Sequence, residues 1–108
     1  MIDWARVTEL ADEIGPDDMD DVMGLFFEEA DETLDRLIDG LAPDKTAAAL
    51  HFLKGSALNL GFSDLARACE TGERAVMAGQ PPDAPGIAAL YAASRAALEQ
   101  GMAARRAA

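Results

Sequence analysis

The sequence has few residues that favour strands and no stretch that could cross a membrane. Its 108 residues include only eleven β-branched residues, scattered along the chain, whereas alanine and leucine are abundant. Strands favour the first class and helices the second. No apolar run approaches the roughly 20 residues of a membrane-spanning helix, and the N-terminus lacks the basic start and apolar core of a signal peptide. We therefore expect an all-α protein located in the cytoplasm, with no membrane partner.

Cysteine, histidine and nucleotide-binding motifs are also scarce. The single Cys69 cannot form an internal disulfide, which fits a reducing compartment. The chain has neither a glycine-rich phosphate-binding loop nor a second histidine, so we expect no cofactor, no metal and no kinase activity of its own. Because 108 residues is a common length for one domain with one core, residues 1–108 are predicted to form a single domain.

Basic residues are few, and they are almost absent from one part of the chain. The formal net charge is −11, and residues 9–39 carry thirteen acidic residues against a single base, Arg36. Residues 40–80 hold four acids and four bases, so the surroundings of the only histidine, His51, are locally neutral. An anionic surface repels phosphate backbones, which argues against a nucleic-acid partner. The acidic run itself is interpreted as a solvated helix face.

Apolar residues recur every three or four positions, a pattern typical of amphipathic helices. The predicted helices cover residues 3–14, 17–41, 43–60, 63–77 and 87–102. Asp17 or Asp18 is expected to cap the second helix and Ser63 the fourth. Residues 79–86 are predicted to be a loop because of their prolines and glycines, and the tail 103–108 is expected to fray. Such helices bury their apolar faces best in an up-down four-helix bundle, with the short first helix as a brace.

The third predicted helix places its histidine outside the core. At 100° per residue, an apolar stripe forms on one face from Thr46, Leu50, Leu53, Ala57 and Leu60. His51, Gly55, Leu58 and Phe62 fall on a second face, with Lys54 beside the histidine. A mid-helix glycine costs about 0.8–1 kcal/mol relative to alanine, and here it leaves the imidazole accessible to another protein. A tolerated surface glycine and a structural histidine are the alternative interpretations.

The neighbour of His51 on the next helix follows from counting. If the third and fourth helices form an antiparallel hairpin that turns near residues 62–63, His51 lies opposite residues 73–74. Glu73 flanks the buried stripe of the fourth helix, whereas Arg74 points away from it. We therefore expect Glu73 to accept a hydrogen bond from the Nδ1–H group of His51, which would leave Nε2 free as a nucleophile. An ordinary boundary glutamate is the alternative.

This pattern resembles the histidine phosphotransfer (Hpt) domain family over about residues 5–77. The family motif, His-x-Leu-Lys-Gly-Ser, then Leu-Gly, then Leu, Ala, Cys and Glu on the next helix, is matched here by His51, Leu53, Lys54, Gly55, Ser56, Leu60, Gly61, Leu65, Ala66, Cys69 and Glu73. One departure is Gly72, where the family usually has a large apolar residue. We expect it to thin the packing between the third and fourth helices.

The resemblance implies a function as well as a fold. His51 would accept a phosphoryl group at Nε2 from the aspartyl phosphate of a response-regulator receiver domain, or of a hybrid sensor kinase, and pass it to another receiver. Lys54 would lie near the phosphoryl oxygens and Glu73 beside the imidazole. Gly55, Ser56, Leu58, Gly61 and Phe62 would belong to the partner-binding face. Mg²⁺ is expected in the receiver partner only, and the chain is expected to be a monomer.

Two other functions remain as alternatives from different classes. A phosphorylation-silent adaptor would bind the same partners without exchanging phosphate, but it would not need a histidine, a lysine and a mid-helix glycine together. A hydrolase would use His51 as a general base, but the possible nucleophiles Ser56 and Cys69 lie on other faces, and Cys69 is expected to be buried.

Overall fold

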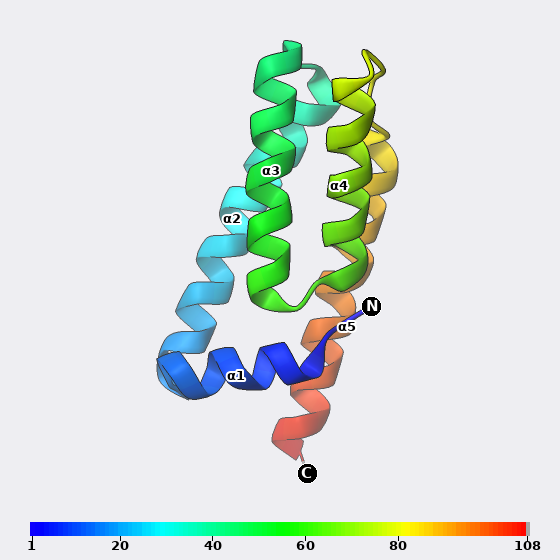
Figure 1. Ribbon diagram of the computed structural model, residues 1–108. Helices are drawn as coiled ribbons and strands as arrows, with labels where there is room; N and C mark the ends of the chain where they lie inside the picture. The colour runs from blue at the N-terminus through cyan, green and yellow to red at the C-terminus, as the bar shows by residue number, and fades with distance from the viewer. Residues whose placement is uncertain (108) are drawn as a thin grey trace.

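The computed structural model describes residues 1–107, and this part of the chain forms five helices (Figure 1). They are α1 (Trp4–Ile14), α2 (Pro16–Asp39), α3 (Pro43–Leu60), α4 (Ser63–Met77) and α5 (Ala84–Ala107). The predicted all-α fold is therefore confirmed for the described residues. The order and approximate extent of the five predicted helices are also confirmed.

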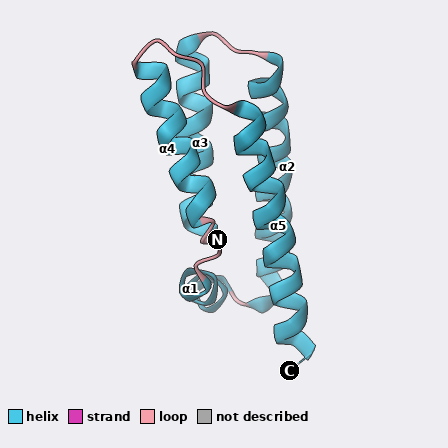
Figure 2. Cartoon of the chain, turned by 90° about the vertical axis from the view of Figure 1, so that its right-hand side faces the viewer, coloured by secondary structure: helices cyan, strands magenta, loops and turns pink. Residues whose placement is uncertain are grey.

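The four longer helices form an up-down bundle, and the first helix braces one end of it. In Figure 1, α2, α3, α4 and α5 run alongside one another, while α1 lies across the lower end beneath α3 and α4. Figure 2 shows the α2–α3 and α4–α5 connections together at the opposite end. The most extensive packing is between α3 and α4. The hairpin of α3 and α4 includes the exposed face of α3 on which His51 was predicted to lie.

Helix boundaries follow the local chemistry, with two corrections to the predicted caps. The side chain of Asp3 accepts a hydrogen bond from the Arg6 N–H at 3.2 Å and so caps α1. Helix α2 starts earlier than predicted, with Gly15 as its N-cap and Pro16 in its first turn, so Asp17 and Asp18 lie inside the helix. Proline is well suited to that position because its missing N–H has no partner there anyway.

The second cap correction is at the start of α4, where Phe62 and not Ser63 is the N-cap and no side chain caps the helix. The preceding residue, Gly61, ends α3 with a left-handed backbone (φ +79°). Its carbonyl accepts a hydrogen bond from the Asp3 N–H at 2.7 Å. The α3–α4 turn is thus paired with the N-terminal segment, which fixes the direction in which α4 leaves.

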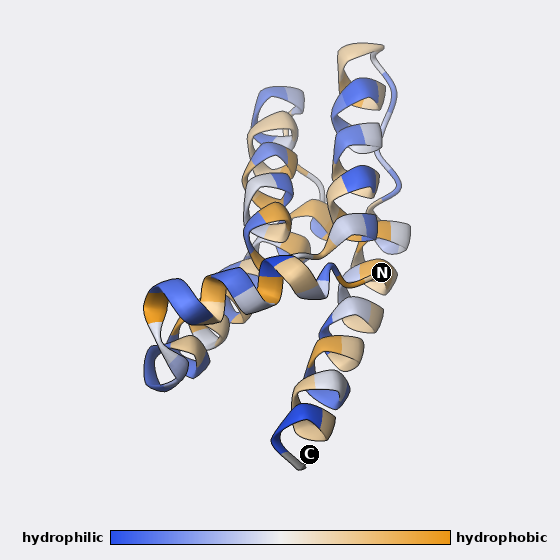
Figure 3. Ribbon diagram, turned by 60° about the horizontal axis from the view of Figure 1, so that its bottom comes forward, coloured by the Kyte–Doolittle hydropathy of each residue, from blue (hydrophilic) through white to orange (hydrophobic). Residues whose placement is uncertain are grey.

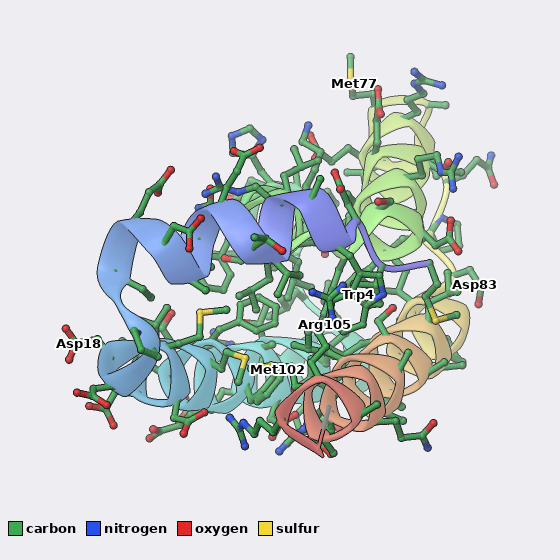
Figure 4. The ribbon with its side chains drawn as sticks, turned by 90° about the horizontal axis from the view of Figure 1, so that it is seen from below. Trp4, Asp18, Met77, Asp83, Met102 and Arg105 are labelled. Carbon is green, nitrogen blue, oxygen red and sulfur yellow. The ribbon has the colours of Figure 1, made fainter. Side chains whose placement is uncertain are left out.

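Helix α5 differs from the prediction at both ends. It begins at Ala84 and not Ile87, because the Asp83 carboxylate accepts a hydrogen bond from the Gly86 N–H at 3.0 Å and caps the first turn. The tail predicted to fray is helical to residue 107. Arg105 stacks 4.2 Å from the centre of the Trp4 ring, and the two side chains lie together in Figure 4. This long-range contact holds the last turns of α5 against α1.

Hydrophilic and hydrophobic positions alternate in bands along the helices, as Figure 3 shows, and the hydrophobic ones form one core.

Gly72 does not thin the α3–α4 packing as expected. A methyl group at this position would lie 3.1 Å from a Leu50 methyl carbon and 3.4 Å from Pro82, so these two side chains already occupy the space. Packing against Leu50 and Pro82 therefore compensates for the missing side chain.

Candidate functional site

Helix α3 holds the histidine rigidly while exposing it to solvent. Its neighbours Leu50 and Leu53 are completely buried in the core, which fixes the rotation of the helix about its axis. The side chain of His51 is 75% exposed as a result. All five residues of the predicted apolar stripe are buried, so the helical projection located the core face and the exposed position of His51 correctly.

Two charged side chains lie next to the imidazole on the α4 side. The Nδ1 atom of His51 is 3.6 Å from Oε2 of Glu73, and the Nζ atom of Lys54 is 3.0 Å from Oε1 of the same carboxylate. The side chains of Lys54 and Glu73 are about three-quarters buried. The position of Glu73 opposite His51 is thus confirmed. The predicted hydrogen bond is not formed in this structure, because 3.6 Å exceeds hydrogen-bond length.

The two nitrogens of the His51 imidazole ring lie in different environments. The carboxylate of Glu73 lies on the Nδ1 side and favours a proton on that atom. Nε2 is on the opposite edge of the ring, and the high exposure of His51 leaves it open to a partner. Oε1 of Glu73 is buried and accepts no hydrogen bond from the described residues, so its charge is balanced by the ion pair with Lys54.

The centre of the exposed face of α3 is open. Gly55 is exposed, and a methyl group at its position would meet no atom within 4 Å apart from its own helix and chain neighbours. Leu58, one turn further along, is 57% exposed, as predicted for a residue available to a partner. Ser56 lies on the other flank, where it lines a groove shared by α1, α2 and α3. It therefore belongs to this face but not to the Lys54–Glu73 pair.

Two residues assigned to the partner-binding face are not on it. Phe62 is completely buried and packs edge to face on Phe26, with ring centres 5.8 Å apart. Gly61 is buried as well and is covered by the N-terminal segment. The projection failed here because the left-handed turn at Gly61 ends the helix, so the 100° rotation no longer applies to the next residue. Both residues shape the α3–α4 turn.

Phe52 is an exposed apolar residue that the sequence reasoning missed. It follows His51 directly on α3 and is 39% exposed. The signal was present, because Phe52 is a large apolar residue outside the predicted core stripe. An aromatic residue left in solvent beside the histidine extends the apolar part of this face toward α2.

The other candidate nucleophile is not available for chemistry. Cys69 is completely buried. Burial, together with the nearby Glu73 carboxylate, raises the pKa of its thiol to about 12, so it remains a neutral thiol near pH 7. Within residues 1–107, no three His, Cys, Asp or Glu side chains are grouped so that they could bind a metal ion. Of His51 and Cys69, only His51 is exposed to solvent.

Comparisons with known proteins agree with the geometry. A family model described as Hpt domain matches residues 21–108, which is well over half of the chain. Neither the curated proteins nor the solved structures that were searched include a match. In residues 1–107, none of the helices combines the length and the apolar character needed to cross a membrane. Hpt domains carry out histidine phosphotransfer in phosphorelays, and this chain belongs to the Hpt domain family.

Proposed function

We propose that this protein carries a phosphoryl group on Nε2 of His51 and exchanges it with the aspartate of receiver domains. The observation that carries the proposal is the orientation of His51 on a rigid helix, three-quarters exposed and with its Nδ1 side next to Glu73. Membership of the Hpt domain family implies this class of reaction. The assignment of the reaction to particular atoms of this chain is our inference.

The protonation of the ring suits transfer in both directions. In the forward step the Nε2 lone pair attacks the phosphorus of an aspartyl phosphate, the P–O bond to the aspartate breaks, and its electrons leave with the carboxylate. The proton stays on Nδ1, so the phosphorylated ring is cationic and faces the Glu73 carboxylate. In the reverse step an oxygen of a receiver aspartate attacks the phosphorus and forms the new P–O bond, while the P–N bond breaks and its electrons return to Nε2. The leaving group is then a neutral imidazole and not an imidazolate anion.

Lys54 and Glu73 would act as positioning residues in this scheme. Lys54 lies one turn from His51 and is close enough to the site to share its charge between Glu73 and the added phosphoryl oxygens. Phosphoryl transfer depends mainly on positioning and charge stabilisation. The receiver is expected to supply Mg²⁺ and the aspartate, whereas this chain supplies the nucleophile and the docking surface.

The surface around His51 suits close contact with a folded partner. Exposed apolar side chains flank the open position at Gly55: Leu58 on the α4 side and Phe52 on the α2 side, with Leu25 of α2 lining the groove next to Ser56. A receiver centred on His51 would cover these groups. The adaptor alternative uses the same surface and differs only in the absence of transfer.

Transfer from a phosphorylated receiver tests the proposal directly. Wild-type protein and His51→Gln would be incubated with ³²P-labelled receiver domains of the source organism and Mg²⁺, and separately with ATP alone. We expect an acid-labile, base-stable label on the wild type only, and none from ATP. Because His51 is largely exposed, both proteins should show the same thermal unfolding, which serves as the folding control. Tight binding of receivers without transfer would support the adaptor instead, and equal labelling of His51→Gln would refute the assignment.

A further inference from the structure

Helices α2 and α3 form a groove between them. It is lined by Thr33, Arg36, Leu41, Lys45, Phe52 and two alanines. We call it the α2–α3 groove, and its volume is about 330 Å³. One wall is formed by the C-terminal half of α2 and the other by the N-terminal half of α3. Phe52, which follows His51 in the sequence, is the lining residue closest to the histidine along α3.

The two cations of the groove have no acidic partner among the described residues. The chain has nine lysines and arginines. Six of them form ion pairs with carboxylates: Arg6, Lys54, Arg67, Arg74, Arg95 and Arg106. Arg105 stacks on Trp4. Arg36 and Lys45 are the two that have neither a carboxylate nor an aromatic ring of residues 1–107 as a partner, although the net charge is −11.

The dipole of α2 favours a cation at Arg36, which lies in the last turn of that helix, but it does not explain why Arg36 has no acidic partner. Arg36 has acidic residues at pairing distance along α2, Glu32 one turn before and Asp39 one turn after, but pairs with neither. Its guanidinium donates instead to the hydroxyl of the buried Thr33 at 3.4 Å, on the wall of the groove. Lys45 lies in the first turn of α3, where the helix dipole disfavours a positive charge. An intramolecular role therefore explains neither the place of Lys45 nor the lack of an acidic partner at Arg36.

The groove lies within reach of a partner docked on His51. Lys45 precedes the histidine by six residues, which is about 9 Å along the helix axis at 1.5 Å per residue. A standard interface covers about 800 Å² on each partner, equivalent to a disc with a radius of about 16 Å. Lys45 lies about 120° around the axis from His51 at 100° per residue, on the side of α2, so a receiver centred on His51 reaches the groove with the α2 edge of its contact surface.

We propose that the α2–α3 groove binds an acidic side chain, set beside an apolar one, on the receiver that docks at His51. This inference rests on the proposed function. The carboxylate would pair with Arg36 and Lys45, and the apolar group would contact Phe52. Acidic residues dominate the rest of α2 and repel a carboxylate, so along α2 an acidic receiver gains attraction only in this groove. The groove therefore selects among receivers by charge, since specificity is a difference between affinities.

The test compares two charge reversals that change the net charge equally. Lys45→Glu replaces one of the two groove cations with an acid and also suits the N-terminal end of α3, so its fold should be intact. Arg106→Glu is the control, because Arg106 is exposed near the end of α5 and pairs with Asp20, away from the groove. The affinity and the transfer rate would be measured with a receiver that phosphorylates wild-type His51, at about 50 and 300 mM salt. Arg36→Gln would serve as a second groove variant.

We expect Lys45→Glu to weaken receiver binding roughly 10-fold at low salt and by less at high salt, because rim charges act through screened attraction. Arg106→Glu should stay within about 2-fold of the wild type. Equal effects of Lys45→Glu and Arg106→Glu would overturn the groove proposal while leaving wild-type transfer, and so the proposed function, intact. A wild type that exchanges phosphate with no receiver would refute the proposed function, and the groove proposal would fall with it.

Discussion

Replacing Gly55 with alanine should make the protein more stable and less active. Gly55 is in the middle of α3, exposed, and a methyl group there would contact no neighbouring element. The folded chain therefore loses nothing by the change and gains helix propensity of about 0.8–1 kcal/mol. For a domain of this size that corresponds to a rise in Tm of about 4 °C.

The same methyl group should interfere with docking, because it projects one turn from His51 into the contact area. An extra methyl group in a closely packed contact costs typically about 1–3 kcal/mol. The second-order rate constant for phosphoryl transfer from a receiver should therefore fall by about 10-fold, with a range of roughly 5- to 150-fold. Thermal unfolding by circular dichroism and single-turnover transfer kinetics would measure the two effects separately.

Gly24 of α2 provides the matched control. It is also exposed and mid-helix, with no atom within 4 Å of an added methyl group. Asp20, one turn earlier, pairs with Arg106 of α5, so this flank of α2 faces away from α3. Gly24→Ala should raise the Tm equally and leave transfer unchanged. If Gly55→Ala is more stable than the wild type yet transfers phosphate at the wild-type rate, the argument that docking requires a residue without a side chain at position 55 is refuted.

Three further predictions concern the interior and the charges around the site. Glu73→Gln keeps the shape of the side chain but removes the charge facing His51, so transfer should slow on the order of 10-fold, whereas the exposed Glu70→Gln should have no effect in the same kinetic assay. Ser94 is completely buried and its hydroxyl has no partner among the described residues; Ser94→Ala should raise the free energy of unfolding by about 1 kcal/mol in urea titrations, and a loss of stability would show that the hydroxyl is satisfied. The pKa of Cys69 is raised from 9.0 to about 12 by burial, so between these pH values the unfolded chain loses its thiol proton first and the free energy of unfolding falls as the pH rises. Urea unfolding at pH 8 and 10.5 should show a smaller fall for Cys69→Ala than for the wild type.

The face of each helix was predictable from the sequence because a regular helix repeats its geometry. The spacing of Leu50, Leu53 and Ala57 located the core side of α3 and therefore the exposed side that carries His51. The antiparallel hairpin then placed Glu73 next to His51 by counting alone. These predictions depend only on local periodicity and on one turn.

The features that were mispredicted depend on an irregular backbone or on distant contacts. Phe62 is buried because a left-handed residue interrupts the periodicity. The start of α5 was taken for a loop because the proline and glycine there gave a loop signal, although the cap supplied by Asp83 makes a helical first turn favourable. The α2–α3 groove could not be predicted from the sequence either. Whether a cation pairs with a given acid depends on side-chain directions, which a sequence does not specify.

The contact between the two ends of the chain has a consequence for folding kinetics. Gly101 leaves room for the Trp4 ring, which any side chain at that position would strike, and Trp4 also stacks with Arg105. Trp4 is about one hundred positions from both residues, so the contact closes a very long loop and is entropically costly until the rest is ordered. We expect this contact to form after the rate-limiting step, so that Trp4→Phe speeds unfolding and leaves the refolding rate almost unchanged.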